Sequence, residues 1–438
     1  MKTSKLWFLI MTALIMTGVA CSGDGKEEVV TPPIPEEPSD TAKPDVPVIE
    51  SKLVTPKGHV DIMIPAELIK VNDAANQFSL NFFDQMVKHT EASSNIVVSP
   101  FYAQAALAMM ANGAKGETLD EMLAVLNMKG FSLDEINSYN QTVIKAIADL
   151  DNTTYPMSAN GVWSKQDLLD GFSGSMQAAY DAKVEKTDFS QDAIAAINDW
   201  AYKKTYGMIP RLFEEKEEVN SEVVLANALY FYGVWADPFG SAAKKDAFTN
   251  ADKSAALQSY MEKEEERLHY LSCETFDLCD KYYGNGAFSM TFLLPHKDVT
   301  PGKAVSDLAQ MDWKGLTAKL LGTRVLVTLT VPSFELKGMS YDLTPALKEM
   351  GMQKAFSDTA EFGNMTDKAA LPIGKVNQKT AMMLTKQGTQ TATTMKQLGI
   401  ISWNGEETAD FYLSRPFAFL IWERSTGVIL FAGVVNKL

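Results

Sequence analysis

Residues 171–175 (Gly-Phe-Ser-Gly-Ser) come nearest, in this chain, to the spacing of a catalytic serine. A nucleophile elbow needs Gly-x-Ser-x-Gly on a sharp turn between a strand and a helix. Ser175 stands where the second glycine is required, and no strand is expected before residue 171. The sequence also lacks the glycine-rich loop that cradles phosphates and the His-Glu-x-x-His pair that binds zinc. We therefore expect a protein that is not an enzyme.

Metal-ligand chemistry is equally poorly supported. The four histidines form no close cluster with the cysteines: His59, His89, His269 and His296. A zinc site is therefore not expected, nor any other metal or cofactor. Cys273 and Cys279 flank a short run in a strand-rich stretch, where a hairpin disulfide and two free buried thiols both fit. The carboxylate-rich runs at 214–218 and 262–266 are typical of solvated faces.

The composition indicates a large acidic chain. Of its 438 residues, 46% are hydrophobic, which is enough for a sizeable core in one large domain or two ordinary ones. The formal net charge is −15. An acidic surface repels the phosphates of nucleic acid, so we expect no nucleic-acid partner. The charge serves solubility.

The first residues predict an export signal. Lys2 and Lys5 precede an apolar run at 6–15, and small residues at 17–20 precede Cys21. This is the layout of a secretory signal peptide, and the run is too short for a comfortable membrane span, although an uncleaved anchor is the alternative. Cys21 after Ala20 resembles a bacterial lipobox, which implies lipidation of Cys21.

The stretch after Cys21 predicts a tether. Acidic residues at 24–28 resemble the surface-export signal of Bacteroidetes lipoproteins, and residues 31–56 hold seven of the eighteen prolines. Such a stretch cannot bury a core and should be extended. We expect a signal peptide at 1–20, a lipidated cysteine and tether at 21–60, and a folded domain at 61–438. The expected location is the outer membrane, with display at the cell surface or, alternatively, on the periplasmic side.

The folded part changes from helical to strand-forming patterns. Apolar residues recur at helical spacing through 66–88, Ser99 and Pro100 suit the start of a second helix, and Thr118 to Glu121 has the spacing of a capping box. Strands are expected later, at 223–231, 288–294, 323–331, 417–422 and 428–434. Helices first and strands afterwards predict an α+β fold.

Four blocks of the chain resemble signatures of the serpin family of protease inhibitors. They are residues 95–118 (beginning Asn-Ile-Val-Val-Ser-Pro), 225–239 (Leu-Ala-Asn-Ala-Leu-Tyr), 332–356 (Pro-Ser-Phe-Glu-Leu) and 416–433 (Pro-Phe-Ala-Phe). The resemblance implies helices packed on three β-sheets, with an exposed reactive-centre loop. It also implies a framework that lets one sheet open: Asn95, Ser99, Asn227, Trp235 and Gln378.

The same resemblance implies a suicide mechanism. A target protease cleaves the loop and forms an acyl-enzyme, and the cut loop then inserts as a new strand in the sheet. The attached protease is distorted before it can hydrolyse the ester. Serpin loop insertion is a known case of strand addition that releases stored strain. The implied partner is the target protease, held covalently by a monomeric inhibitor.

The segment that would insert is rich in threonine. Its hinge residues are Lys386, Gly388, Thr389, Gln390, Thr391, Ala392, Thr393 and Thr394. Gly388 matches the hinge glycine, and β-prone threonines follow it. Because side chains alternate along a strand, Thr389, Thr391, Thr393 and Met395 would share the buried face. Lys396 falls on the other face, which keeps its charge out of the core, whereas Gln397 falls on the buried side.

Three residues depart from the family pattern. Lys386 stands where an acidic residue is usual, Tyr102 where a small serine is usual, and Gln378 where a histidine usually helps to hold the central strands. These departures keep a second interpretation open, in which the protein is a non-inhibitory serpin that acts as a surface binding module.

The usual inhibitory spacing, counted from Gly388, places the scissile bond at Ser402–Trp403, with Ile400 and Ile401 as alternatives. No Arg or Lys lies between Lys396 and Arg415. A trypsin-like pocket needs a basic residue at the cut, because its buried carboxylate is otherwise unpaired. We expect elastase-like serine proteases, or papain-like cysteine proteases, as targets.

Overall fold

The computed structural model describes residues 56–438, apart from 206, 208, 215–218, 220–221, 241–242, 368–372, 375 and 390–406. The expected signal peptide, Cys21 and all but the end of the expected tether lie outside the described residues. No helix in the described part of the chain has the length and apolar character needed to cross a membrane.

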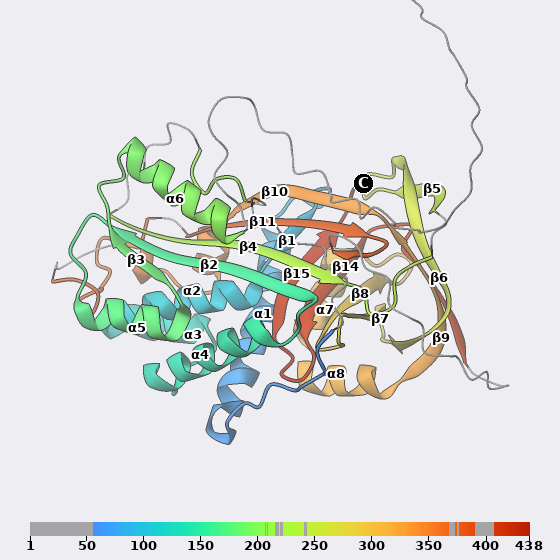
Figure 1. The fold of residues 1–438 in the computed structure, drawn as a ribbon, viewed down its shortest axis with the longest axis horizontal. Helices are drawn as coiled ribbons and strands as arrows, with labels where there is room; N and C mark the ends of the chain where they lie inside the picture. Colours follow the sequence, from blue (N-terminus) through green and yellow to red (C-terminus); the bar gives the residue numbers. More distant parts are fainter. Residues whose placement is uncertain are drawn as a thin grey trace, which may run out of the picture. The chain divides into compact units, whose positions relative to one another are not determined.

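Helices occupy most of the first part of the chain and return near residue 300 (Figure 1). They are η1 (Ala66–Leu68), α1 (Ile69–Lys88), α2 (Pro100–Gly113), α3 (Gly116–Val125), α4 (Leu133–Asp149), α5 (Asp170–Tyr180), α6 (Gln191–Lys204), α7 (Pro301–Ala309), α8 (Trp313–Gly322), α9 (Thr344–Glu349) and η2 (Lys354–Phe356). Helix α2 is buried on nearly every side, as its alanine-rich, uncharged sequence requires.

The capping box expected at Thr118 is wrong. Helix α3 begins earlier, at Gly116, and the Thr118 hydroxyl accepts a hydrogen bond from the distant Glu361 N–H at 3.0 Å. A capping box does form at α4, where the Ser132 hydroxyl accepts from Glu135 N–H and the Glu135 carboxylate accepts from Ser132 N–H. Spacing alone did not separate the two, because Thr118 is fully buried and has a tertiary partner.

A six-stranded sheet crosses the molecule and carries the expected hinge. Its strands, in spatial order, are β10 (Phe334–Asp342), β11 (Val376–Thr385), β12 (Gly388–Thr389), β4 (Val223–Val234), β2 (Thr154–Ser164) and β3 (Lys183–Lys186). Helix α6 covers one face, where Ile194 and Ile197 pack on Trp163 and Ala226. Helices α1 and α2 lie beyond the other face (Figure 1). This sheet is therefore enclosed on both sides.

The remaining strands form one continuous nine-stranded sheet rather than two. Its order is β1 (Ile96–Val98), β15 (Ile429–Val435), β14 (Phe417–Glu423), β8 (Phe288–Pro295), β7 (Phe276–Tyr283), β6 (Ala255–Ser272), β9 (Arg324–Pro332) and β13 (Thr408–Tyr412), with β5 (Ala243–Thr249) paired to β6. The expected three sheets thus become two ladders among the described residues. The 18-residue strand β6 joins the two halves through a bulge between Lys263 and Glu266, where Glu265 has a φ of 47°.

The structure also shows the state of the two cysteines and the environment of the acidic run 262–266. Cys273 and Cys279 are both free, and Cys279 is buried in the core, so the alternative with free thiols holds. The run 262–266, which we expected to be a solvated face, is part of β6. Glu264 and Glu265 are exposed there, whereas Glu266 is largely buried against Lys281.

His269 makes folding sensitive to acid. It is 4% exposed on β6, and its ring bonds to the hydroxyl of Tyr282, which also accepts from Arg324 and Arg424 at 3.3 and 2.8 Å. Burial, followed by the charge of Arg324, lowers the pKa of His269 to about 4. The unfolded chain, in which the pKa of histidine is about 6.5, therefore binds a proton more readily.

We expect the stability contributed by His269 to be complete above pH 6.5 and to be lost as the pH falls from about 6.5 to about 4. His269→Gln should therefore flatten the decline in melting temperature between pH 7 and pH 5. His89→Gln, at a partly exposed surface position, is the control and should keep the decline of the wild type. An equal decline in wild type and His269→Gln would contradict this assignment.

Candidate functional site

The hinge begins as a strand already seated in the six-stranded sheet. Gly388 and Thr389 form β12, which pairs antiparallel with β11 and antiparallel with β4. Thr385 faces Gly388 on one side, and Val234 faces it on the other. The first two residues after the hinge turn therefore lie between the two central strands.

Below β12, strands β11 and β4 pair directly with each other in parallel, from Val376 opposite Leu225 to Ala381 opposite Tyr230. Where β12 stands between the two strands, Leu384 of β11 and Gly233 of β4 both face Thr389. The residue numbers of Leu384 and Gly233 differ by the same amount as those of the directly paired Val376 and Leu225. A strand that continued from β12 down the sheet would therefore meet both neighbours in register, without a bulge. A strand inserted between β11 and β4 would have one register, and β12 already sets it.

Glycine is required at position 388 by close backbone contact. Its φ is 149°, and a Cβ atom there would lie 2.0 Å from the carbonyl oxygen of Gly233 and 2.7 Å from Cα of Val234. Both contacts are with the backbone of β4, which cannot move like a side chain. The close approach explains why the hinge carries glycine at this point.

Three donors in the segment after β4 hold the hinge turn. The Trp235 indole N–H donates to the Thr385 carbonyl at 3.1 Å, and the Trp235 backbone N–H donates to the Gln387 carbonyl at 2.9 Å. The Phe239 N–H donates to the Lys386 carbonyl at 3.1 Å. The Trp235 ring stacks on Tyr283, with 4.3 Å between ring centroids. We call residues 235–240 the hinge clamp, because they hold three successive carbonyls of the turn.

At the opposite end of the gap, Gln378 ties β11 to the start of α2. Its carboxamide accepts from the Ser99 N–H at 2.7 Å and donates to the Ser99 carbonyl at 3.0 Å, while the Ser99 hydroxyl donates to the Leu430 carbonyl. Gln378 and Ser99 are fully buried. In the ladder Gln378 lies opposite Asn227 of β4. A glutamine thus supplies both a donor and an acceptor where the family usually has a histidine.

Asn95 acts on the end of the chain rather than on the sheet that opens. Its side chain accepts from the N–H groups of Asn436 and Lys437 at 2.7 and 2.9 Å and donates to the Lys437 carbonyl at 2.7 Å. This places Asn95 at the edge pair β1–β15. The five framework residues therefore do not meet at one point.

The rest of the expected loop lies outside the described residues: Gln390, Thr391, Ala392, Thr393, Thr394, Ile400, Ile401, Ser402 and Trp403. Of the hinge, the structure describes Lys386, which is exposed in the turn, together with Gly388 and the backbone pairing of Thr389. The stretch 171–175 lies within helix α5, where the Ser175 hydroxyl donates to the Gly171 carbonyl. It is not a strand-to-helix elbow.

The sequence interpretation missed two side chains that support the hinge clamp, Tyr283 and Lys281. Both lie on β7, whose sequence Phe-Asp-Leu-Cys-Asp-Lys-Tyr-Tyr places charges inside an otherwise apolar strand. Lys281 is 1% exposed in its side chain. A charged residue within an apolar strand was the available signal, since such a group must find a partner when it is buried.

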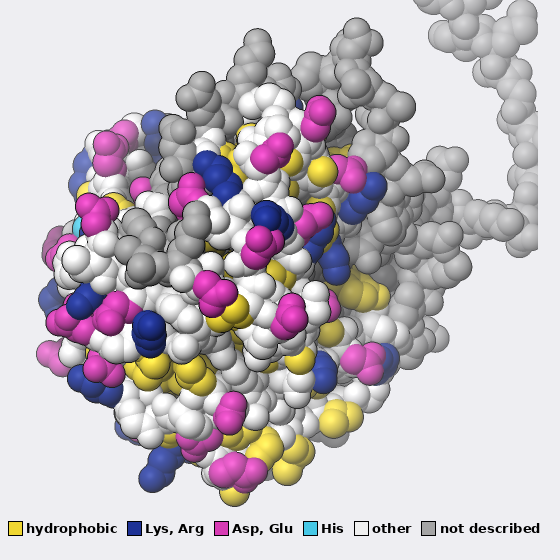
Figure 2. All heavy atoms as spheres, turned by 90° about the vertical axis from the view of Figure 1, so that its left-hand side faces the viewer, with side chains coloured by type: hydrophobic (Ala, Val, Ile, Leu, Met, Phe, Trp, Pro, Cys, Tyr) yellow, Lys and Arg dark blue, Asp and Glu magenta, His cyan; other side chains and the backbone are white. Residues whose placement is uncertain are grey.

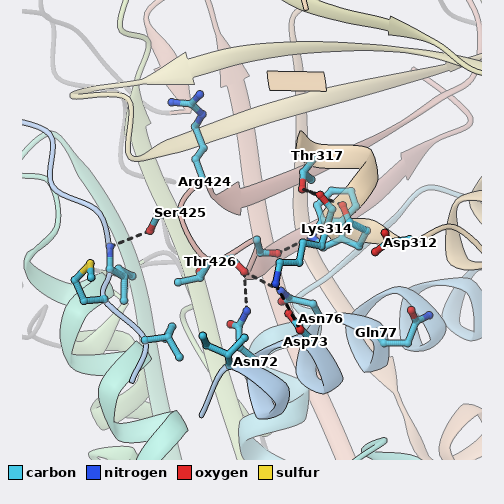
Figure 3. A pocket seen from close by; sticks show the side chains of 16 residues that line it. Asn72, Asp73, Asn76, Gln77, Asp312, Lys314, Thr317, Arg424, Ser425 and Thr426 are labelled. Atoms are coloured by element: carbon cyan, nitrogen blue, oxygen red, sulfur yellow. Dashed lines mark hydrogen bonds and ion pairs between the residues drawn. The ribbon is translucent and has the colours of Figure 1, made fainter. Parts of the chain in front are cut away.

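A separate pocket lies between the N-terminal segment, α1, α8 and the turn after β14 (Figure 3). Its volume is about 440 Å³, within the size range of small-molecule sites. Asn72 and Asn76 both donate to the Thr426 carbonyl at 2.9 Å, and Lys314 lies 3.8 Å from Asp73. Trp313 adds an apolar wall.

The described surface shown in Figure 2 carries acidic and basic side chains interspersed, with no continuous basic region among them. Within the described ranges, no three His, Cys, Asp or Glu side chains converge as metal ligands.

In the six-stranded sheet, the two-residue strand β12 stands between the ends of β11 and β4, which pair in parallel with each other below it. A family model described as serpin (serine protease inhibitor) matches residues 73–438, and the chain belongs to the serpin family. Serpins as a family inhibit target proteases, although some members do not.

Relatives and solved structures agree with this assignment. Iripin-3 of Ixodes ricinus is 28% identical over 353 residues, covering 78% of this chain and 89% of its own. Leukocyte elastase inhibitor of Bos taurus is 29% identical over 390 residues, covering 84% and 99%. The native-state structure of the thermophilic serpin tengpin has a TM-score of 0.75 at 25% identity, covering 88% and 98%. Human thyroxine-binding globulin complexed with thyroxine has a TM-score of 0.73 at 26% identity, covering 85% and 99%.

Gly388→Ala should expel β12 from the sheet, because its methyl group meets the backbone of β4. With a local cost of ~1–3 kcal/mol, deuterium exchange at the Thr389 amide should accelerate about tenfold or more. Gly286→Ala is the control, since its φ is also positive (84°) but the new Cβ meets nothing closer than 3.9 Å. Unchanged exchange at residues 387–389 in Gly388→Ala would show that the hinge tolerates a side chain.

Proposed function

We propose that this serpin is a suicide inhibitor of endopeptidases that acts by loop cleavage and strand insertion. The observation that carries the proposal is β12, which already pairs with both β11 and β4 in the one register that continues down the sheet. Such a start favours the pairing of the residues that follow it with the same two strands. The proposed inhibitor acts as a monomer, because each molecule supplies its own strand.

The chemistry belongs to the protease and the motion to the inhibitor. The protease nucleophile attacks the carbonyl carbon of Ser402, the bond to Trp403 breaks, and Trp403 leaves with a free amine. Ser402 remains bound to the protease as an acyl group. Residues from Gln390 onward then enter the gap below β12, carrying the protease with them before water can hydrolyse the acyl bond.

The register assigns a neighbour to each inserting residue. Continued from β12, the register would place Thr391 between Met382 and Phe231, and Thr393 between Thr380 and Leu229; these four neighbours are buried in the sheet. Met395 would lie between Gln378 and Asn227, and Lys396 next to the half-buried Asn377. In this register the threonines and Met395 would face inward, as the sequence alternation predicts. Gln397 would lie beside the buried Val376 and Leu225, as the bulkiest polar residue on the inner face.

The proposed targets are elastase-like serine proteases, with papain-like cysteine proteases as a second group. Ile400 and Ile401 precede Ser402, and no basic residue lies near the bond. Leukocyte elastase inhibitor of Bos taurus is among the relatives, which agrees with this choice.

We also propose that the protein is a bacterial lipoprotein anchored through Cys21 and related to Bacteroidetes serpins. The layout of residues 1–56 supports this. The tether would hold the inhibitor at the outer membrane, on the cell surface or on the periplasmic side.

Incubation with pancreatic elastase should give a complex that survives SDS, together with a released C-terminal peptide that begins at Trp403. Trypsin should give no such complex, because no basic residue is available at the cut. A protease panel on gels, with mass spectrometry of the peptide, measures both. A stable complex with trypsin and none with elastase would show that the reactive bond lies elsewhere.

Thr391→Arg should convert the inhibitor into a substrate, because its guanidinium would have to enter the core between Met382 and Phe231 at a cost of several kcal/mol. Gln390→Arg is the matched control, since its neighbours Met383 and Tyr232 are on the outer face and half-buried. After loop cleavage, the melting temperature should rise in wild type and Gln390→Arg but not in Thr391→Arg. Equal behaviour of the two variants would refute the register.

A second candidate function is the non-inhibitory binding module, and the pocket beside Trp313 favours it. Human thyroxine-binding globulin, a structure of the same fold, is complexed with thyroxine. If cleavage leaves the melting temperature of the wild type unchanged and no protease forms a complex, this second candidate replaces the first.

A further inference from the structure

The hinge clamp rests on four charged side chains. Lys281 of β7 pairs with Glu266 of β6, and Lys263 of β6 pairs with Asp237 of the clamp itself, at 2.8 Å between Nζ and Oδ1. The Lys281 side chain is 1% exposed and the Glu266 side chain 14%. The clamp backbone is fixed to the same two strands, since Ala236 N–H donates to the Tyr282 carbonyl and Gly240 N–H donates to the Glu262 carbonyl.

The buried ammonium group of Lys281 lies against both aromatic rings of the clamp. Its Nζ is 5.0 Å from the ring centroid of Phe239 and 5.9 Å from that of Trp235. A cation at this distance from an aromatic face is attracted to the ring, and the attraction grows when water is excluded. Trp235 and Phe239 are the same residues whose N–H groups hold the three hinge carbonyls. One cation therefore touches both halves of the hinge clamp.

Fold stability alone does not explain this ion pair. Desolvation is costly here, and burial raises the pKa of Glu266 above its usual range despite the adjacent Lys281. Apolar residues of similar volume commonly replace such buried pairs without loss of stability. A buried cation is, however, attracted to the faces of the rings around it, which an apolar side chain of similar volume is not.

We propose that Lys281 is a positioning residue for loop insertion: paired with Glu266, its ammonium holds Trp235 and Phe239 so that the turn 385–387 keeps β12 seated between β11 and β4. The seated strand is the nucleus from which residues 390 onward pair. The role of Lys281 in inhibition rests on the proposed function, whereas its effect on the position of β12 between β11 and β4 does not.

Hydrogen–deuterium exchange of the intact, uncleaved protein tests the seat of β12 directly. In Lys281→Met, the amides of Trp235, Phe239 and Thr389 should exchange about tenfold or more faster than in wild type. Lys281→Arg, which keeps the charge over the rings, should restore most of the protection. Lys354→Met is the control, because Lys354 of η2 pairs with Glu117 of α3 and with Glu361, none of which belongs to β6, β7 or the hinge clamp.

The single variant Lys281→Met leaves the buried Glu266 carboxylate without its partner. The double variant Lys281→Met/Glu266→Gln is therefore measured beside it, and it replaces the single variant if that variant does not fold. Fast exchange confined to the clamp and β12 in the double variant supports the proposal. Exchange equal to wild type, or accelerated equally throughout the nine-stranded sheet, overturns it, since a merely structural role loosens the whole neighbourhood.

Inhibition provides an independent readout. Where the wild type forms the covalent complex, Lys281→Met should be cleaved at the wild-type rate but should consume several-fold more inhibitor per protease trapped. An unchanged ratio, with faster exchange, would overturn the link to insertion. If the wild type forms no complex at all, the proposed function fails, while the exchange measurement still decides the role of Lys281.

Discussion

The shared register of β11 and β4 is the constraint on which the rest of the structure depends. These strands pair in parallel from Val376–Leu225 to Ala381–Tyr230, yet β12 stands between their ends, antiparallel to both. A parallel pair is slightly less stable than an antiparallel one, so replacing it with two antiparallel pairs is favourable. The register of a strand placed between β11 and β4 is therefore already set at the β12 end of the pair.

The two edges of that position are held differently. Strand β11 is fastened from inside, since Gln378 bonds to the Ser99 backbone and the Thr380 hydroxyl donates to the Val97 carbonyl at 2.7 Å. Strand β4 pairs on its other side with β2, which in turn pairs with β3, and α6 covers this part of the sheet. The β11 side is thus fastened by hydrogen bonds to the backbone of Ser99 and Val97, whereas the β4 side is fastened by its ladder with β2 and by packing. At the hinge end, the clamp ties the two sides together through the turn.

The sequence allowed the family, the order of helices and strands, and the glycine at the hinge to be predicted, because these depend on local patterns and recurrent blocks. It did not reveal the clamp, since Trp235, Phe239 and the hinge carbonyls are about 150 residues apart and meet only after β4 and β11 pair. It also misjudged Glu266, because an acidic run shows no sign of the bulge that turns one of its members inward. The capping box predicted at Thr118 was wrong for a similar reason, because the Thr118 hydroxyl accepts a hydrogen bond from the distant Glu361 N–H instead of capping a helix.

Asn95 and the strands it secures have a consequence for synthesis of the protein. Strands β14 and β15 occupy the space between β8 and β1 in the nine-stranded sheet, although they are the last strands in the chain. Until they leave the ribosome, the nascent chain exposes two unpaired strand edges and the apolar surface between them. Folding of the whole domain must therefore wait for residues 417–435, and a chaperone that shields β1 and β8 would meet this serpin at that stage.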